Sequence, residues 1–134
     1  WFSINTQFSY IPFIFYIGAI FWTLAYDTIY GFQDIKDDEI IGVKSTSIKF
    51  KNSPKLFIFI CYSFFVLMQI IAGVLMNFSY YYFVGILIIS VHLLIFQNLR
   101  LNISNQDSCL SKFKSNNFLG FLIFLNIITN KFYF

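Results

Sequence analysis

Three aspartates, Asp27, Asp34 and Asp38, are the residues whose types and spacing most directly suggest chemistry. Asp27 precedes Asp34 by seven residues, and Asp34 precedes Asp38 by four. At 3.6 residues per turn, one helix through this stretch would place the three carboxylates within about 40° on one face, with Tyr30 close by. Such a row of like charges is unfavourable beside lipid, and a cation removes the penalty. Hard carboxylate oxygens suit Mg²⁺, so the spacing predicts a magnesium site that also takes substrate phosphate.

A second interpretation needs no ligand. The same stretch contains lysines, and a solvated loop of mixed charge would result if Lys36 and Lys44 neutralised the acids. Asp37 and Glu39 lie off the common face and are expected to point elsewhere, as solvated groups or groups behind the metal ligands. The acids follow directly on an apolar helix, however, and this position at the mouth of a bundle favours the metal interpretation.

The composition places these acids in a membrane protein. Of 134 residues, 58% are hydrophobic, 23% aromatic and only 11% charged, whereas soluble domains usually carry about 25% charged residues. A bilayer accepts such a surface, so we predict an all-α, polytopic transmembrane helix bundle. The net charge of +3 forms no basic stripe, so nucleic acid is not an expected partner. Cys61 and Cys109 form no CxxC pair, and Cys61 is expected to act as a small buried apolar residue.

Four stretches of low charge predict membrane crossings of about 20 residues each. The expected spans cover about residues 10–27, 55–76, 80–98 and 117–134, and an acid-rich loop covers 27–55. Ser9 and Ser53 can cap helices that carry a proline in their first turn. Three consecutive tyrosines at 80–82 predict an aromatic belt at the interface, and His92 is expected to hydrogen-bond a neighbouring helix.

The loops predict the orientation. The first and third connections carry the loop lysines and Arg100, whereas the turn at Asn77 is uncharged. The positive-inside rule therefore places the acid-rich loop in the cytoplasm, or in the matrix of an organelle. We expect a bacterial inner membrane or a mitochondrial inner membrane.

The stretch around the aspartates resembles the second aspartate-rich motif of the UbiA superfamily of intramembrane prenyltransferases. It fits the pattern DxxYxxxDxxxD with Asp27, Tyr30, Asp34 and Asp38. Further runs look specifically like the 4-hydroxybenzoate polyprenyltransferase branch. They are Trp22-Thr23-Leu24, Gly42-Val43-Lys44-Ser45-Thr46 and, near the end, Cys109-Leu110 with Phe113-Lys114-Ser115-Asn116 and the run from Gly120. The resemblance covers nearly the whole chain, residues 1–134.

This resemblance implies a bundle of nine transmembrane helices around a central cavity. It implies transfer of a polyprenyl chain from its diphosphate to the ring of 4-hydroxybenzoate, a step of ubiquinone biosynthesis. Two aspartate-rich motifs would hold Mg²⁺ and the diphosphate while the allylic C–O bond ionises. The allylic cation would then attack the ring carbon beside the phenol.

The resemblance also implies roles for individual residues. The implied metal ligands are Asp27, Asp34 and Asp38, the implied catalytic groups are Asp34, Asp38 and Lys44, and the implied diphosphate-binding groups are Tyr30, Lys44, Lys114 and Asn116. Two of them have plain alternatives, since Tyr30 suits an interfacial tyrosine and Lys44 suits a positive-inside lysine.

The chain departs from the family pattern because the first motif, NDxxDxxxD, is absent. We therefore expect a C-terminal part of the fold whose partners are the lipid bilayer, the two substrates and a missing N-terminal half. Two alternatives stay open. One is a non-catalytic membrane remnant or partner subunit of a split or decayed gene. The other is a cation-binding transporter segment, which the position of the acids at a helix end disfavours.

Overall fold

The first long helix, α1, spans Ile11–Gly31 in the computed structural model, which describes residues 9–133. Pro12 lies in its first turn, where a missing N–H costs no hydrogen bond, and Ser9 Oγ accepts a hydrogen bond from the Ile11 N–H at 3.3 Å. The helix runs past the predicted end at residue 27, so Asp27 lies inside it.

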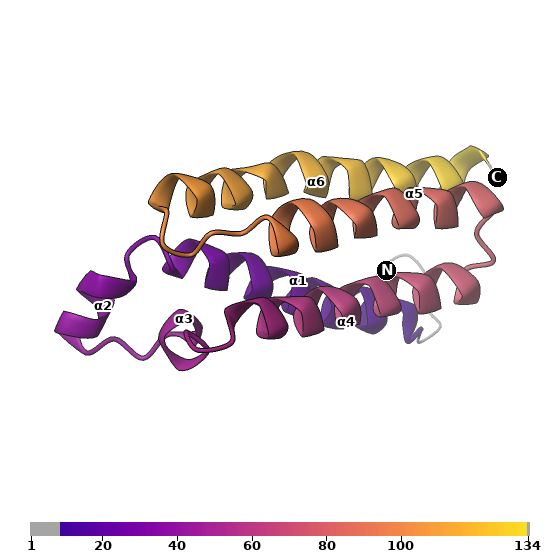
Figure 1. Ribbon diagram of the computed structural model, residues 1–134. Coiled ribbons are helices and arrows are strands. Elements are labelled where there is room, and N and C mark those ends of the chain that lie inside the picture. The colour runs from indigo at the N-terminus through magenta and orange to yellow at the C-terminus, as the bar shows by residue number, and fades with distance from the viewer. Residues whose placement is uncertain (1–8, 134) are drawn as a thin grey trace.

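Three further long helices complete the bundle (Figure 1). Helix α4 spans Pro54–Leu75, α5 spans Tyr80–Val91 and continues as the π-helix η1 over His92–Leu99, and α6 spans Gln106–Tyr133. Helix α1 packs against α4 and α6, and α5 with η1 packs against α4 and α6 in turn. The prediction of an all-α bundle is confirmed.

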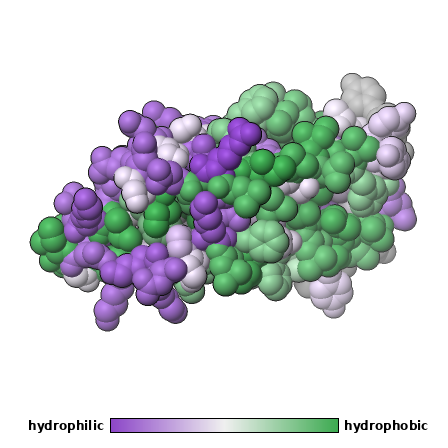
Figure 2. Space-filling model, viewed as in Figure 1, coloured by the Kyte–Doolittle hydropathy of each residue, from purple (hydrophilic) through white to green (hydrophobic). Residues whose placement is uncertain are grey.

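Three helices in the described part of the chain are long and apolar enough to cross a membrane. They are Ile11–Gly31, Pro54–Leu75 and the continuous unit Tyr80–Leu99. Helix α6 also runs the length of the bundle, but its first half is polar, and the predicted span over 117–134 stays a prediction. Hydrophilic residues gather at the end of the bundle that holds the acid-rich segment, while apolar residues cover the long helices (Figure 2).

Helices α4 and α5 approach closely because α4 carries a glycine where they cross. A Cβ on Gly73 would lie 2.3 Å from Cε1 of Tyr82, so no larger residue fits there without repacking. The Tyr82 side chain is fully buried and its hydroxyl lies 3.0 Å from the Gln69 carbonyl oxygen. Tyr80 and Tyr81 are 77% and 64% exposed, as expected for an aromatic belt. The prediction of an interfacial position is wrong for Tyr82, because the first turn of α5 directs this ring between the helices.

The turn between these two helices is closed by a left-handed residue. Asn77 adopts φ 53°, and the Phe78 N–H donates to the Gly73 carbonyl at 3.0 Å. This is the hydrogen bond that ends many helices, and asparagine tolerates the conformation better than most residues. The predicted turn at Asn77 is confirmed.

The acid-rich segment is not a continuation of α1. Two short helices, α2 (Ile35–Ile41) and α3 (Thr46–Lys49), follow α1 at one end of the bundle (Figure 1). The Phe32 and Gln33 N–H groups donate back to Ile29 and Tyr30, which closes α1. Asp34 has non-helical angles of φ −115° and ψ 17° and precedes α2 as its N-cap. The single helix considered for residues 27–38 is therefore wrong, and the three aspartates do not share one helix face.

Helix α3 folds back against the end of α1. Thr28 Oγ1 and Thr46 Oγ1 are 2.7 Å apart, so the start of α3 is joined to the last turns of α1. Ser47 is buried directly against Gly31, where a Cβ would lie 2.3 Å from Ser47 Oγ. A residue with a side chain in place of Gly31 would therefore collide with Ser47.

Candidate functional site

A polar pocket of about 500 Å³ lies where the chain breaks after α1. One wall is the segment from Phe32 to Asp37, and the other is the segment from Ile103 to Asp107 before and at the start of α6. Asp34 and Asp37 lie on the first wall, and Asp107 lies on the second. The pocket thus has carboxylates on both walls, from segments far apart in the sequence.

Lys36 lies on the same wall as Asp34 and Asp37, but it forms no close ion pair with the acids of this segment. Among the residues that the structure describes, Asp34, Asp37 and Asp38 form no ion pair, and neither Lys36 nor Lys44 comes within 4.0 Å of a carboxylate oxygen. Lys36 shares the pocket with Asp34 and Asp37 without touching their carboxylates, so the interpretation as a loop neutralised by its own lysines stays open beside the metal interpretation.

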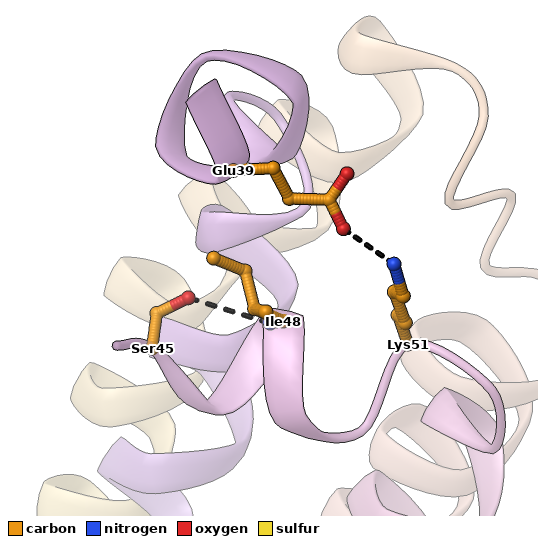
Figure 3. Close-up of polar contacts among 4 residues, drawn as sticks. All are labelled: Glu39, Ser45, Ile48 and Lys51. Carbon is orange, nitrogen blue, oxygen red and sulfur yellow. Dashed lines mark hydrogen bonds and ion pairs between the residues drawn. The ribbon is translucent and has the colours of Figure 1, made fainter. Parts of the chain in front are cut away.

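Glu39 behaves differently from these aspartates. Its Oε1 accepts a hydrogen bond from Lys51 Nζ at 2.6 Å, an exposed ion pair that joins α2 to the chain after α3 (Figure 3). This agrees with the expectation that Glu39 points away from the predicted metal site. Asp37, for which the same was expected, instead lines the pocket beside Asp34.

The donors of the pocket fit part of a magnesium–diphosphate site. Mg²⁺ needs only one or two protein carboxylates when phosphate oxygens and water supply its other ligands. Gln33, on the same wall, has a buried side-chain oxygen Oε1 without a hydrogen-bond partner. Within residues 9–133, no three His, Cys, Asp or Glu side chains gather closely enough to hold a metal by themselves. A cation here would therefore depend on ligands from a bound phosphate group.

Asp27 lies apart from this pocket. It lines an apolar groove of about 400 Å³ along α1, together with Tyr16, Ala19, Ile20, Thr23 and Leu24. Since Asp27 is the last of these residues along the helix, it marks the polar end of the groove. Asp38 is half-buried on α2 and lies outside the lining of the polar pocket. The structure does not gather Asp27, Asp34 and Asp38 in one cavity, and their joint role as metal ligands stays a prediction.

The four residues expected to bind diphosphate fall into two places. The Tyr30 ring packs against Phe113 of α6 with centroids 4.6 Å apart, and Lys114 is the exposed residue that follows. Asn116 lines a small pocket of about 310 Å³ between α1 and α6. Lys44 is exposed in the link between α2 and α3. Tyr30, Lys114 and Asn116 therefore lie near the contact of α1 with α6, and Lys44 lies on the acid-rich segment.

The side chain of Asn116 also has a clear structural use. It is only 6% exposed, and its Oδ1 accepts hydrogen bonds from Trp22 Nε1 at 3.0 Å and from Gln97 Nε2 at 3.1 Å. The Tyr62 hydroxyl in turn donates to Gln97 Oε1. These four side chains come from α1, α4, η1 and α6, so one buried polar network joins all the long helices.

Tyr62 and Gln97 were not among the residues predicted to matter. The available signal was the pair of amides Gln97-Asn98 at the end of an apolar span, where a polar side chain must find a partner inside the bundle. His92, one turn earlier, was expected to contact a neighbouring helix, and its Nε2 lies 3.5 Å from Ser115 Oγ of α6.

We expect Gln97→Leu to destabilise the bundle. The change removes the acceptor for the buried Tyr62 hydroxyl, and an unpaired buried polar group costs about 1–3 kcal/mol. Unfolding in mixed micelles by denaturing detergent would measure the difference. Asn117→Leu is the matched control, because Asn117 is exposed and makes no such contact. A loss of equal size in both variants would contradict a specific role for the network.

The run Gly42-Val43-Lys44-Ser45-Thr46 forms the link between α2 and α3 and shapes both helix ends. Gly42 ends α2 with φ 81°, in the left-handed region that favours glycine. Ser45 Oγ accepts a hydrogen bond from the Ile48 N–H at 3.3 Å and caps α3, as Figure 3 shows. Together with the Thr46–Thr28 contact, these residues hold the acid-rich segment against the end of α1.

Comparison with known families identifies the chain. Residues 1–127 match the UbiA prenyltransferase family. The chain belongs to this family. The membrane helices of the UbiA chain and the resemblance drawn from its aspartate motif agree with this result.

Individual relatives of this UbiA chain are similar over most of its length. It is 36% identical to the mitochondrial 4-hydroxybenzoate polyprenyltransferase of Dictyostelium discoideum over 87% of the chain, and 35% identical to that of Aedes aegypti over 88%. It is 34% identical to the 4-hydroxybenzoate octaprenyltransferase of Francisella tularensis subsp. mediasiatica over 92%. The aligned part makes up 25%, 26% and 43% of these three proteins. No solved structure matches the UbiA chain.

Proposed function

We propose that this chain is the C-terminal part of a Mg²⁺-dependent 4-hydroxybenzoate polyprenyltransferase of ubiquinone biosynthesis. The complete enzyme would move a polyprenyl group from polyprenyl diphosphate to 4-hydroxybenzoate. The observation that carries the proposal is the similarity to enzymes of this name over 87% to 92% of the chain. The pocket with unpaired Asp34 and Asp37 supports it, because carboxylates without counterions suit a cation that a diphosphate accompanies.

The carboxylates of this chain would bind the metal, and its cationic and hydroxyl side chains would bind the diphosphate. Asp34 and Asp38 would hold the cation from the segment after α1, with Asp27 facing the same substrate from the end of its groove. Bound Mg²⁺ would stabilise the charge that develops on the leaving diphosphate. Lys44 and Lys114 are exposed cations and would attract the diphosphate, and the exposed Tyr30 would donate a hydrogen bond to it. Asn116, which the resemblance also assigns to the diphosphate, is buried and would support this side of the site through its network.

The apolar groove along α1 suits the other end of the donor substrate. Its residues from Tyr16 to Leu24 offer a hydrocarbon surface that ends at Asp27. An isoprenoid chain in this groove would place its diphosphate toward the polar end. Apolar walls would also keep water away from an allylic cation.

The remainder of the site would come from another part of the enzyme. The chain spans about a quarter to 43% of the length of the relatives it matches. We infer that an N-terminal half, the missing partner, supplies the first aspartate-rich motif and most of the aromatic-acid pocket. Helices of a membrane protein can insert first and assemble later, so two separate parts can form one bundle.

A transfer assay tests this proposal. The chain would be co-expressed with a matching N-terminal half, purified in lipid, and given a polyprenyl diphosphate, 4-hydroxybenzoate and Mg²⁺. We expect prenylated product that disappears when EDTA removes the metal. A pair that co-purifies but makes no product would instead support the alternative of a non-catalytic partner subunit or remnant.

The proposed location is a bacterial inner membrane or the mitochondrial inner membrane, with the acid-rich loop on the cytoplasmic or matrix side. Lys44→Cys should react with a membrane-impermeant maleimide from that side, and Asn77→Cys only from the other. The native thiols should stay silent, because Cys61 and Cys109 are both buried. Burial also raises the pKa of the Cys109 thiol, which keeps it protonated and unreactive. Labelling of both positions from one side would refute this orientation.

A further inference from the structure

The two walls of the polar pocket are joined by one hydrogen bond. Gln106 Nε2, at the start of α6, donates to the backbone carbonyl oxygen of Gln33 at 2.9 Å. Both residues line the pocket, and they are 73 positions apart in the sequence. No motif that pointed to the function includes Gln106.

The accepting carbonyl belongs to the peptide unit that leads into Asp34. A peptide unit is planar, so the C=O of Gln33 and the N–H of Asp34 move together. This unit lies in the break between α1 and α2, where the angles of Asp34 are non-helical. A donor that holds the Gln33 carbonyl therefore fixes the direction in which the chain enters Asp34.

Gln106 projects from a loop that is braced by its own side chains. Asn102 Oδ1 accepts a hydrogen bond from the Ser104 N–H at 3.1 Å, and Asn105 Oδ1 accepts one from the Ser108 N–H at 2.9 Å. Ser108 Oγ accepts a further hydrogen bond from the Asn102 N–H at 3.3 Å. Such a support holds the side chain that extends from it in a defined place.

The charge of the pocket explains why an amide suits this position. Three carboxylates, those of Asp34, Asp37 and Asp107, line the pocket with one cation, Lys36, so an additional carboxylate would increase the repulsion among the acids. A lysine would compete with a bound cation. Glutamine provides an N–H donor of sufficient length and adds no charge.

We propose that Gln106 is a positioning residue for the metal–diphosphate site, acting through the Gln33–Asp34 peptide unit. The loop before α6 is then the second wall of that site and holds the acid-rich segment in its binding geometry. This inference rests on the proposed function, since it assumes that Asp34 binds a cation with diphosphate.

Binding of Mn²⁺ with inorganic diphosphate tests the inference without any prenyl transfer. The probe would be Mn²⁺ followed by electron paramagnetic resonance, on the chain assembled with its N-terminal half. Gln106→Met keeps the length of the side chain and removes the donor. We expect it to weaken binding by about 2- to 12-fold, the factor that corresponds to one ordinary hydrogen bond. Gln106→Glu also lacks the donor and should weaken binding at least as much.

Two comparisons separate positioning from a general loss of structure. Asn52→Leu changes an exposed amide between α3 and α4, outside the lining of this pocket, and should leave binding unchanged. In an Asp34→Asn background, Gln106→Met should have no further effect, because both changes act on one group. Equal losses in the two backgrounds would overturn the inference.

The remaining outcomes are also decisive. Unchanged binding in Gln106→Met, or no Mn²⁺–diphosphate binding by the unmutated assembly, would overturn the inference. If the unmutated assembly binds the probe but transfers no prenyl group, the proposed function fails. A specific loss in Gln106→Met would still support the positioning role in that case.

Discussion

Purified alone in lipid, this chain should transfer no polyprenyl group to 4-hydroxybenzoate above the uncatalysed background. A leaving diphosphate develops charge on several oxygens, and catalysis depends on donors and cations placed around all of them. In the described part of the chain, carboxylates line the polar pocket after α1, but no three metal-ligating side chains come together. The groove beside Asp27 is open along α1, so it cannot form a dry cavity by itself.

The assay would compare the chain alone, the N-terminal half alone and the two together, with equal protein and Mg²⁺. Activity should appear only in the combined sample. Clear turnover by the chain alone would contradict the expected division of the active site, and it would mean that residues 1–134 contain a complete site. If the combined sample also forms no product, the proposed function is contradicted.

In the assembled enzyme, Asp34→Asn should lower transfer by about 10²–10³-fold, the usual effect of removing one group that stabilises developing charge. Asp34 has both the motif position and a place in the pocket wall. Asp38→Asn should have a similar effect because Asp38 also occupies a motif position. Asp37→Asn should lower the transfer rate less than either of these two changes. If Asp37 proves more important than Asp38, the lining of the pocket, and not the motif, identifies the second ligand.

Glu39→Gln is the control for this series. Glu39 lies on the same short helix, but its partner is Lys51, and the exposed ion pair contributes about 0–1 kcal/mol. Its loss should leave the rate and the Mg²⁺ requirement nearly unchanged. The series would be measured as product formed against Mg²⁺ concentration. If the Asp34, Asp37 and Asp38 variants all had the same activity as one another, the assignment of a metal site to this segment would be wrong.

Helices α1, α4 and α5 could be predicted from the sequence because each contains a long uncharged run, whereas the charged first half of α6 was assigned to a loop. Pro12 and Pro54 lie in the first turns of α1 and α4, and Asn77 closes the turn after α4, as their conformational preferences predict. The course of the chain from Asp27 to Asp38 could not be predicted in this way. The helical spacing of the aspartates assumed an unbroken helix, whereas α1 ends at Gly31 and α3, which comes from later in the sequence, packs there through Ser47.

The candidate site was predictable in one of its two walls. Asp34 follows from the spacing of carboxylates, which local sequence reveals. The second wall depends on how η1 and α6 are placed, and no local pattern connects Gln106 to Gln33. The burial of Asn116 was missed for a related reason, since its partners Trp22 and Gln97 come from other helices.

The π-helical segment η1 sets a rotational register for everything that follows it. Here the Arg100 N–H reaches back five residues to the Ile95 carbonyl, at 3.1 Å, instead of four. A version one residue shorter could close as an α-helix, but each residue of an α-helix accounts for about 100° of rotation. The loop after η1 would then leave the bundle in another direction, and Gln106 would no longer face Gln33. A single-residue deletion in η1 would therefore alter the wall of a pocket that none of its own residues lines.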